Sequence, residues 1–140
     1  MEDKKTYDDI LNELREQHNI EELLNFNELN IQEKLAANSS KVYHYTELYQ
    51  KALNKYNGIL ELRDQLIGEK YHTIKTKSDV LLKQGEIEKY YLSKDKDVIK
   101  INEVVKRQKA YVDFYDNIRK ALEKQSWNMQ TYLKSLTYGI

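Results

Sequence analysis

The residues best suited to chemistry lie in one basic stretch, GEKYHTIKTKSD, which runs from Gly68 to Asp79. Positions 70 to 78 contain no acidic residue, although acids and bases alternate closely elsewhere in the chain. The candidate binding residues of this stretch are Lys70, Tyr71, His72, Lys75 and Lys77. Lysines neutralise phosphates and an aromatic ring stacks on a base, a combination that holds single-stranded nucleic acid without reading its sequence. The alternative is a solvated helix end, where cations also interact favourably with the helix dipole.

A second basic cluster has the sequence KRQK and contains Lys106, Arg107 and Lys109. The apolar residues around it recur with a helical period, so the cluster is predicted on the polar face of a helix. Such a cluster either extends a nucleic-acid track or is only a solvated face.

The chain lacks the patterns that indicate an enzyme or a metal protein. His18, His44 and His72 are scattered without partners at metal-ligand spacing, and there are no cysteines. No glycine-rich phosphate loop, nucleophile elbow or pair of catalytic carboxylates is present. Asp95 and Asp97 are suitable Mg²⁺ ligands, but the lysines interleaved with them favour a helix cap. We therefore expect a non-enzymatic protein with no metal and no cofactor.

The charge of the chain is balanced overall but divided unevenly along it, with 23 basic and 23 acidic residues in total. Positions 1–33 hold ten acids and three bases, a net charge of −7, and positions 34–140 hold twenty bases and thirteen acids, a net charge of +7. Interaction proteins show such asymmetry, although acids gathered near helix N-termini produce it too. The opening MEDKKTYDD does not resemble a secretory signal, and no apolar run reaches the ~18 residues of a membrane span, so we expect a cytosolic protein without a membrane partner.

Composition and periodicity predict an all-α fold. The chain has no proline and four glycines, and 33% of its residues are charged, which favours long solvated helices. A short amphipathic helix is predicted over DDILNELREQ. A long helix is predicted from Ile31 to about Lys75, with Asn30 and Glu33 as its capping box, and a turn is predicted near Ser78 and Asp79.

A second long helix is predicted after Ser93, and it has the clearest apolar seam of the chain. The seam consists of Val98, Ile101, Val105, Val112, Tyr115, Ile118 and Leu122. Only Gln108 interrupts it. Both long helices have heptad-like spacing and are too long for a monomer of this size to cover, so we predict two long helices with shorter flanking helices that assemble into a homo-oligomer.

Several stretches of the chain resemble the UvsY family of phage recombination mediators. They are YDDILNELRE, KLAANS, GEKYHTIKTKSD, LSKDKDVIKIN and VDFYDNIRKALEKQSWNMQ, in the same order as in that family. The resemblance implies an all-helical ring, a hexamer or heptamer, in the cytoplasm of an infected bacterial host. It also implies that the partners are single-stranded DNA, the single-strand DNA-binding protein and the phage recombinase, which the mediator loads onto DNA without hydrolysing nucleotide.

The resemblance places the DNA-binding basic positions of the family within Gly68 to Tyr71. One of these positions falls on Lys70, and the other falls on Gly68, which carries no charge, so Lys75 and Lys77 are expected to compensate. The expected organisation is a single domain, 1–140, in which 1–26 form an acidic N-terminal helix and linker. The remaining 30–140 form a long-helix body that oligomerises and binds DNA. The competing hypothesis is a structural coiled-coil adaptor with no nucleic-acid role.

Overall fold

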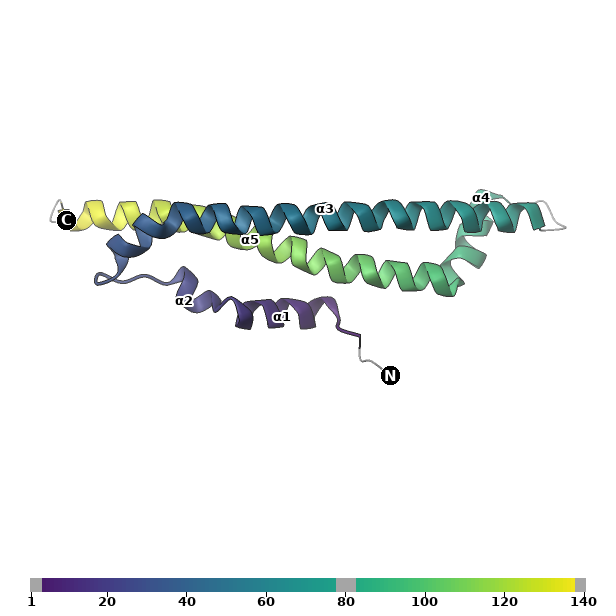
Figure 1. Cartoon of the computed structure of the whole chain (residues 1–140). Helices are drawn as coiled ribbons and strands as arrows, with labels where there is room; N and C mark the ends of the chain where they lie inside the picture. The colour runs from purple at the N-terminus through teal and green to yellow at the C-terminus, as the bar shows by residue number, and fades with distance from the viewer. Residues whose placement is uncertain (1–3, 78–82, 138–140) are drawn as a thin grey trace.

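The computed structural model of the chain describes residues 4–77 and 83–137, and over these residues the protein is all-helical (Figure 1). In chain order the elements are α1 (Tyr7–Gln17), α2 (Ile20–Leu24), α3 (Ile31–Lys77), α4 (Gln84–Glu86), a π-helical turn (Ile87–Tyr91), a 3-10 turn (Leu92–Lys94) and α5 (Lys96–Thr137). The long helices α3 and α5 run antiparallel, and α1 and α2 lie alongside them (Figure 1). The predicted all-α class with two long helices and shorter flanking helices is confirmed. The turn predicted at Ser78 and Asp79 lies outside the described residues.

A capping box starts α1, and an asparagine in the left-handed conformation turns the chain after it. The Asp9 N–H donates to Thr6 Oγ1 (3.2 Å) and the Thr6 N–H donates to Asp9 Oδ2 (3.0 Å), which satisfies two backbone donors near the helix start. Asn19 has a φ of 46°, a conformation that asparagine adopts more readily than most residues. The apolar stripe of α1 buries Ile10 and Leu14, so the acidic N-terminal helix packs into the body of the molecule.

An asparagine pair caps the start of α3. The Asn30 N–H donates to Asn27 Oδ1 (3.0 Å), and the Asn27 N–H donates to Asn30 Oδ1 (2.8 Å). The predicted box between Asn30 and Glu33 is therefore wrong, because the Asn30 side chain turns back to Asn27. The reason is that helical bonding begins one turn earlier than expected, where the Asn27 carbonyl accepts from the Ile31 N–H (3.0 Å).

The two long helices keep one heptad register. Three facing pairs mark it: Asn38 with Leu122, Tyr45 with Tyr115, and Ala52 with Gln108. Each step of seven residues along α3 thus matches a step of seven residues back along α5, the repeat of helices that pack side by side. The side-chain amides of the buried Asn38 and Gln108 each donate to a backbone carbonyl of the opposite helix at 3.1 Å.

Two apolar clusters hold the helices together. The larger one lies where α1, α3 and α5 meet, and its buried members are Ile10, Leu14, Tyr45, Ala110, Phe114, Ile118 and Leu122. The smaller one contains Ile87, Leu92 and Val98, against which Ile67, Tyr71 and Ile74 of α3 pack. The second cluster fastens the end of α3 that carries the basic stretch to the start of α5.

The predicted seam of α5 lies in the interior of the chain. Five of its members, Val98, Val105, Val112, Ile118 and Leu122, are buried, and Ile101 and Tyr115 are half-buried. Burial against α3 and α1 accounts for the seam within one chain, and its role between subunits stays a prediction.

A half-buried histidine lies at the junction of α1 with the long helices. His18 Nδ1 lies 2.9 Å from Tyr45 Oη, and the rings of Phe114 and Tyr115 lie against the imidazole. Its Nε2 is buried and makes no hydrogen bond within the described residues, so protonation would leave an N–H unpaired. Burial, with a smaller contribution from the charge of His44, holds the pKa of His18 below its ordinary value of 6.5.

Replacing Val112 with aspartate should destabilise the fold by at least about 3 kcal/mol, because an unpaired carboxylate would enter the core. Urea denaturation followed by circular dichroism measures the change. Asn117→Asp introduces the same side chain at an exposed position of α5 and should change stability by no more than about 0.5 kcal/mol. Equal stabilities of the two variants would show that the Val112 side of α5 is not a core face.

The protein should lose stability as the pH falls through about 6.5, because the unfolded chain then binds a proton at His18 more readily than the folded chain does. Denaturation at about pH 7.5 and about pH 5.5 should show a smaller loss for His18→Gln than for the wild type. His72→Gln, at an exposed position, is the control and should behave like the wild type. The same loss in all three proteins would contradict the assignment to His18.

Candidate nucleic-acid interface

Residues 68–77 of the basic stretch form the last turns of α3, at one end of the molecule (Figure 1). Lys70 and Tyr71 are half-buried, whereas His72, Lys75 and Lys77 are exposed. The structure thus brings the five predicted residues together on one helix end. They divide into a half-buried inner pair, Lys70 and Tyr71, and an exposed outer group, which consists of His72, Lys75 and Lys77.

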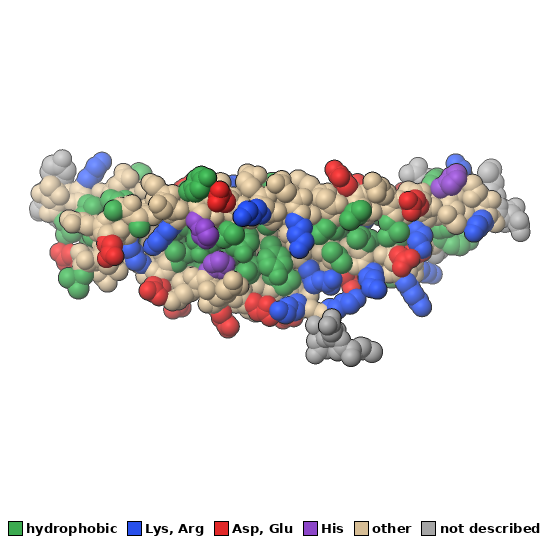
Figure 2. Space-filling model, in the orientation of Figure 1, with side chains coloured by type: hydrophobic (Ala, Val, Ile, Leu, Met, Phe, Trp, Pro, Cys, Tyr) green, Lys and Arg blue, Asp and Glu red, His purple; other side chains and the backbone are tan. Residues whose placement is uncertain are grey.

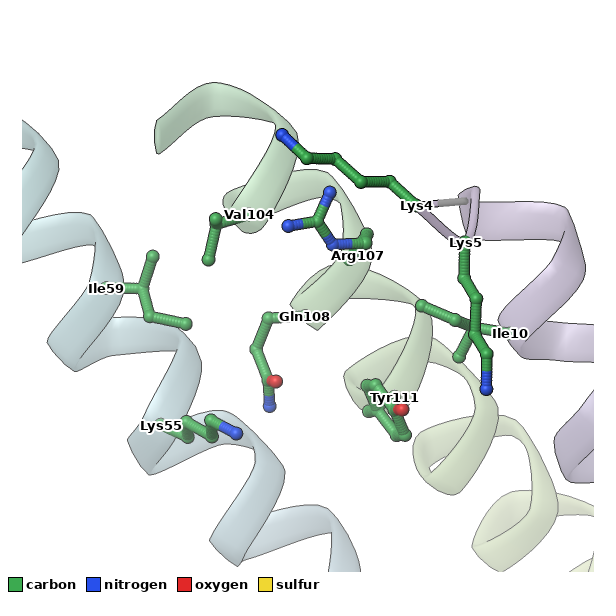
Figure 3. Close-up of a pocket in the computed structure, with 9 residues that line it drawn as sticks. All are labelled: Lys4, Lys5, Ile10, Lys55, Ile59, Val104, Arg107, Gln108 and Tyr111. Atoms are coloured by element: carbon green, nitrogen blue, oxygen red, sulfur yellow. The ribbon is translucent and has the colours of Figure 1, made fainter. Parts of the chain in front are cut away.

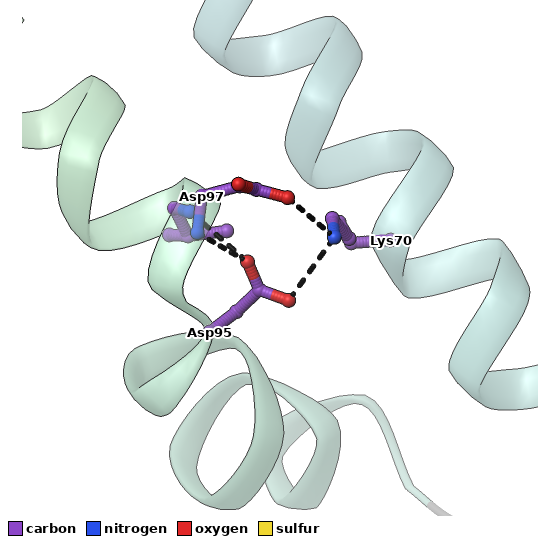
Figure 4. A network of polar contacts seen from close by, with 4 residues as sticks. Lys70, Asp95 and Asp97 are labelled. Atoms are coloured by element: carbon purple, nitrogen blue, oxygen red, sulfur yellow. Dashed lines mark hydrogen bonds and ion pairs between the residues drawn. The ribbon is translucent and has the colours of Figure 1, made fainter.

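Lys70 is held by the cap of α5 (Figure 4). Asp95 Oδ1 accepts from the N–H groups of Asp97 (2.9 Å) and Val98 (3.1 Å), so the predicted capping role of Asp95 is confirmed. Lys70 Nζ lies 2.9 Å from Asp97 Oδ2 and 3.3 Å from Asp95 Oδ2, and we call these three residues the Lys70 clamp. A phosphate that approached Lys70 would therefore have to compete with two carboxylates for the same ammonium group.

The pKa values of this group reflect its hydrogen bonds. The hydrogen bond to Asp97, followed by that to Asp95, raises the pKa of Lys70 above 10.5. The backbone N–H of Val98, assisted by Lys70, holds the pKa of Asp95 below 3.8. Both shifts favour the charged pair at neutral pH.

The ring of Tyr71 contacts both an apolar cluster and a cation. The half-buried ring packs against the apolar cluster of Ile87, Leu92 and Val98. Lys75 Nζ lies over it, 5.9 Å from the ring centroid. A base that stacked on Tyr71 would have to displace the ammonium group of Lys75, whereas His72 and Lys77 are exposed to solvent.

The second predicted cluster is split by its local contacts. Lys109 Nζ lies 3.2 Å from Asp113 Oδ1 and 5.5 Å from the centroid of the Tyr56 ring, so its charge is compensated. Lys106 is exposed and Arg107 is half-buried, and neither makes an ion pair with any described residue.

Arg107 lines a cavity between α1, α3 and α5 that the sequence analysis missed (Figure 3). We call it the cation-lined cavity, and its lining residues are Lys4, Lys5, Ile10, Lys55, Ile59, Val104, Arg107, Gln108 and Tyr111. No acidic side chain of the described residues is among them. The space-filling view shows lysine and arginine side chains gathered over this part of the molecule (Figure 2).

Two features hid this cavity from sequence reasoning. Lys4 and Lys5 lie in a segment whose net charge is negative, so charge sums conceal them. Lys55 and Arg107 are far apart along the chain, and only the register between α3 and α5 brings them to one cavity. The sequence had already indicated Arg107, in the KRQK cluster, but nothing in it connects Arg107 with Lys55.

Across residues 4–77 and 83–137, no three histidine, aspartate or glutamate side chains come together in a way that could hold a metal ion. None of the helices described over the same ranges has the length and apolar content needed to cross a membrane.

Comparisons of the chain with protein-family models, with curated proteins and with solved structures found no match.

Replacing Lys70 with glutamine should lower the stability of the protein near neutral pH, because Asp95 and Asp97 would face each other without a cation. The pKa of Asp95 is depressed in the folded state, so the stabilisation is present above its ordinary value of 3.8 and is lost as the pH falls through the folded-state value. The unfolding temperatures of the wild type and the variant should therefore differ at about pH 6, and the difference should shrink at acidic pH, below the ordinary value of 3.8.

The control is Lys77→Gln, which removes the same charge from an exposed position of the same helix. Its unfolding temperature should equal that of the wild type at both pH values. An unchanged unfolding temperature for Lys70→Gln at about pH 6 would show that the Lys70 clamp contributes nothing to stability.

Proposed function

We propose that this protein is a non-enzymatic recombination mediator, which binds single-stranded DNA and helps to load a strand-exchange recombinase onto DNA covered by single-strand DNA-binding protein. The proposal includes a homo-oligomer, a hexameric or heptameric ring, in the cytoplasm of a bacterium infected by a phage. It combines the motif resemblance with the charge distribution on the fold.

The observation that carries the DNA-binding part is the exposed cationic end of α3. His72, Lys75 and Lys77 are exposed, and no acid lies between positions 70 and 77. Asp95 and Asp97, which lie across from this helix end, are already paired with Lys70. Among the described residues, no acid forms an ion pair with the outer group, so the outer group presents positive charge, which supports a contact with phosphates.

Exposed apolar side chains support the oligomer. Trp127 and Leu136, on the C-terminal part of α5, are 66% and 46% exposed, and Tyr43 and Leu62 of α3 are 67% and 58% exposed. Apolar groups that gather into one patch mark contacts with other chains, and subunits packed side by side would cover these residues. In a ring, the cationic end of α3 would recur once per subunit, and several weak phosphate contacts would act together on one strand.

The cationic end of α3 and the ring together suggest how the recombinase would be loaded onto DNA. Each neutralised phosphate releases counterions, so the summed binding is strong at low salt and falls steeply as salt rises. A strand held along several subunits takes a conformation imposed by the ring. That conformation would favour the recombinase filament over the single-strand DNA-binding protein, because a partner that binds one conformation better shifts the population toward it.

The second candidate function is a structural coiled-coil adaptor. The heptad register of α3 and α5 and the exposed apolar residues favour it as well, since both features serve assembly without nucleic acid. The adaptor hypothesis differs in one measurable respect, because it gives the cationic end of α3 no ligand.

Fluorescence anisotropy of labelled oligo-dT should show binding with a steep inverse dependence on salt. His72→Gln/Lys75→Glu/Lys77→Glu should bind far more weakly, and the slope of log affinity against log salt should fall by about 0.7 for each phosphate that the variant no longer neutralises. Lys70 is left unchanged because its replacement would disturb the Lys70 clamp.

The matched control is Lys124→Glu/Lys134→Glu, which makes the same charge reversals at two exposed positions near the C-terminal end of α5. It should retain most of the affinity if the site is local. Equal reductions in both variants would indicate a general charge effect, and no binding by the wild type at low salt would leave the adaptor function.

A further inference from the structure

The cation-lined cavity brings four cations from three parts of the chain to one space. Lys4 and Lys5 precede α1, Lys55 comes from α3 and Arg107 comes from α5. The volume of the cavity is about 360 Å³. Because its walls belong to three separately placed segments, the cavity exists only in the folded chain.

The acids near the cavity compensate only part of this charge. Lys4 Nζ lies 3.6 Å from Glu103 Oε2, and Lys5 Nζ lies 2.9 Å from Glu13 Oε2. Among the described residues, no acid forms an ion pair with Lys55 or Arg107. These two cations therefore define the uncompensated part of the cavity.

The floor of the cavity strengthens the field of these cations. Ile10, Ile59 and Val104 line it with apolar surface, and low-dielectric walls focus the field into the space between them. Figure 3 shows Lys55 and the amide of Gln108 projecting into the space between α3 and α5. Gln108 is 7% exposed, and its Nε2 is held by the Ala52 carbonyl at 3.1 Å, so this part of the wall is rigid.

We propose that the cation-lined cavity binds a phosphate group. A phosphate carries up to two negative charges and several acceptor oxygens, which can accept from cations on different walls at once. The guanidinium of Arg107 offers paired donors that match two oxygens of one phosphate, while Lys55 supplies a point charge from the opposite helix. This inference goes beyond the proposed function and stands on the cavity alone.

The phosphate has two possible sources, a nucleic-acid strand and a small phosphorylated molecule. Two of the hollows that adjoin the cavity extend it: one shares Lys55, Gln108 and Tyr111 with it, and the other, which Glu103 also lines, shares Lys4, Lys5 and Arg107. Lys51 and Lys106 lie farther along these hollows. A strand has room to continue in both directions, so the experiment includes one arm for each source.

The first arm is a titration of the full-length, isotope-labelled protein with inorganic phosphate, followed by NMR chemical shifts. Sodium chloride at matched ionic strength is the reference. We expect saturable shifts of the cavity signals, those of Gln108 and Tyr111 included. Lys55→Gln/Arg107→Gln should weaken binding about tenfold or more. The control Lys124→Gln/Lys134→Gln removes two charges elsewhere and should leave binding unchanged.

Thermal unfolding separates a ligand site from a structural role. Phosphate should raise the unfolding temperature of the wild type and the control but not of the cavity variant. Without phosphate, the cavity variant should be at least as stable as the wild type, because repulsion between the cations is relieved. Lys55→Gln alone, at an exposed position, should show a weaker form of the same effect if the double variant does not fold.

The second arm measures oligo-dT affinity for the same variants. A reduced affinity confined to the cavity variant supports the proposal with a strand phosphate as the ligand, and phosphate binding without such a reduction supports it with a small molecule. The proposal is overturned if phosphate shifts the NMR signals of the cavity no more than chloride does and the cavity variant keeps its affinity for oligo-dT. It is also overturned if the cavity variant binds phosphate and oligo-dT as tightly as the control variant does. Failure of the wild type to bind oligo-dT would remove the proposed function and leave the phosphate titration to decide this inference.

Discussion

The arrangement of the whole chain depends on the register between α3 and α5. Asn38 and Gln108 are buried polar residues in otherwise apolar seams, and each donates its amide to a carbonyl of the opposite helix at 3.1 Å. A slip of one helix along the other would leave both amides buried without acceptors, at about 1–3 kcal/mol each. Apolar contacts are not directional and tolerate several registers, so the two amides select one of them.

This register decides which charges meet. It places Lys70 beside Asp95 and Asp97 at the start of α5, and it places Lys55 and Arg107 at one cavity without an acid between them. The lysines therefore have different roles: Lys70 is paired with two acids of the chain, whereas others, such as Lys55, present positive charge to solvent. Attraction between exposed charges extends over about 10 Å at moderate salt, so the uncompensated cations define the surfaces available to an anion.

The acidic N-terminal segment takes part in this arrangement in an unexpected way. Burial of Ile10 and Leu14 fixes α1 on the long helices, and the two lysines before it then line the cation-lined cavity. The Tyr7 hydroxyl donates to Asp113 Oδ2 (2.7 Å) and holds the start of α1 to α5. A segment with a net charge of −7 thus contributes positive charge where it meets the body, because position in the fold and not the sum along the chain determines the local field.

The sequence by itself determined the helical class, the bounds of α3 to within a few residues, the start and the buried seam of α5 and the Asp95 cap, because these follow from local spacing. The separate short helix predicted over SWNMQTYLKSL is wrong, because α5 continues without a break to Thr137. It placed the cap of α3 one turn late, since several asparagines compete there. Only the tertiary structure decided that Lys70 is paired and that Lys55 meets Arg107. A heptad seam records which face is apolar, but neither its partner helix nor its register, so contacts between distant positions arise only when the helices pack.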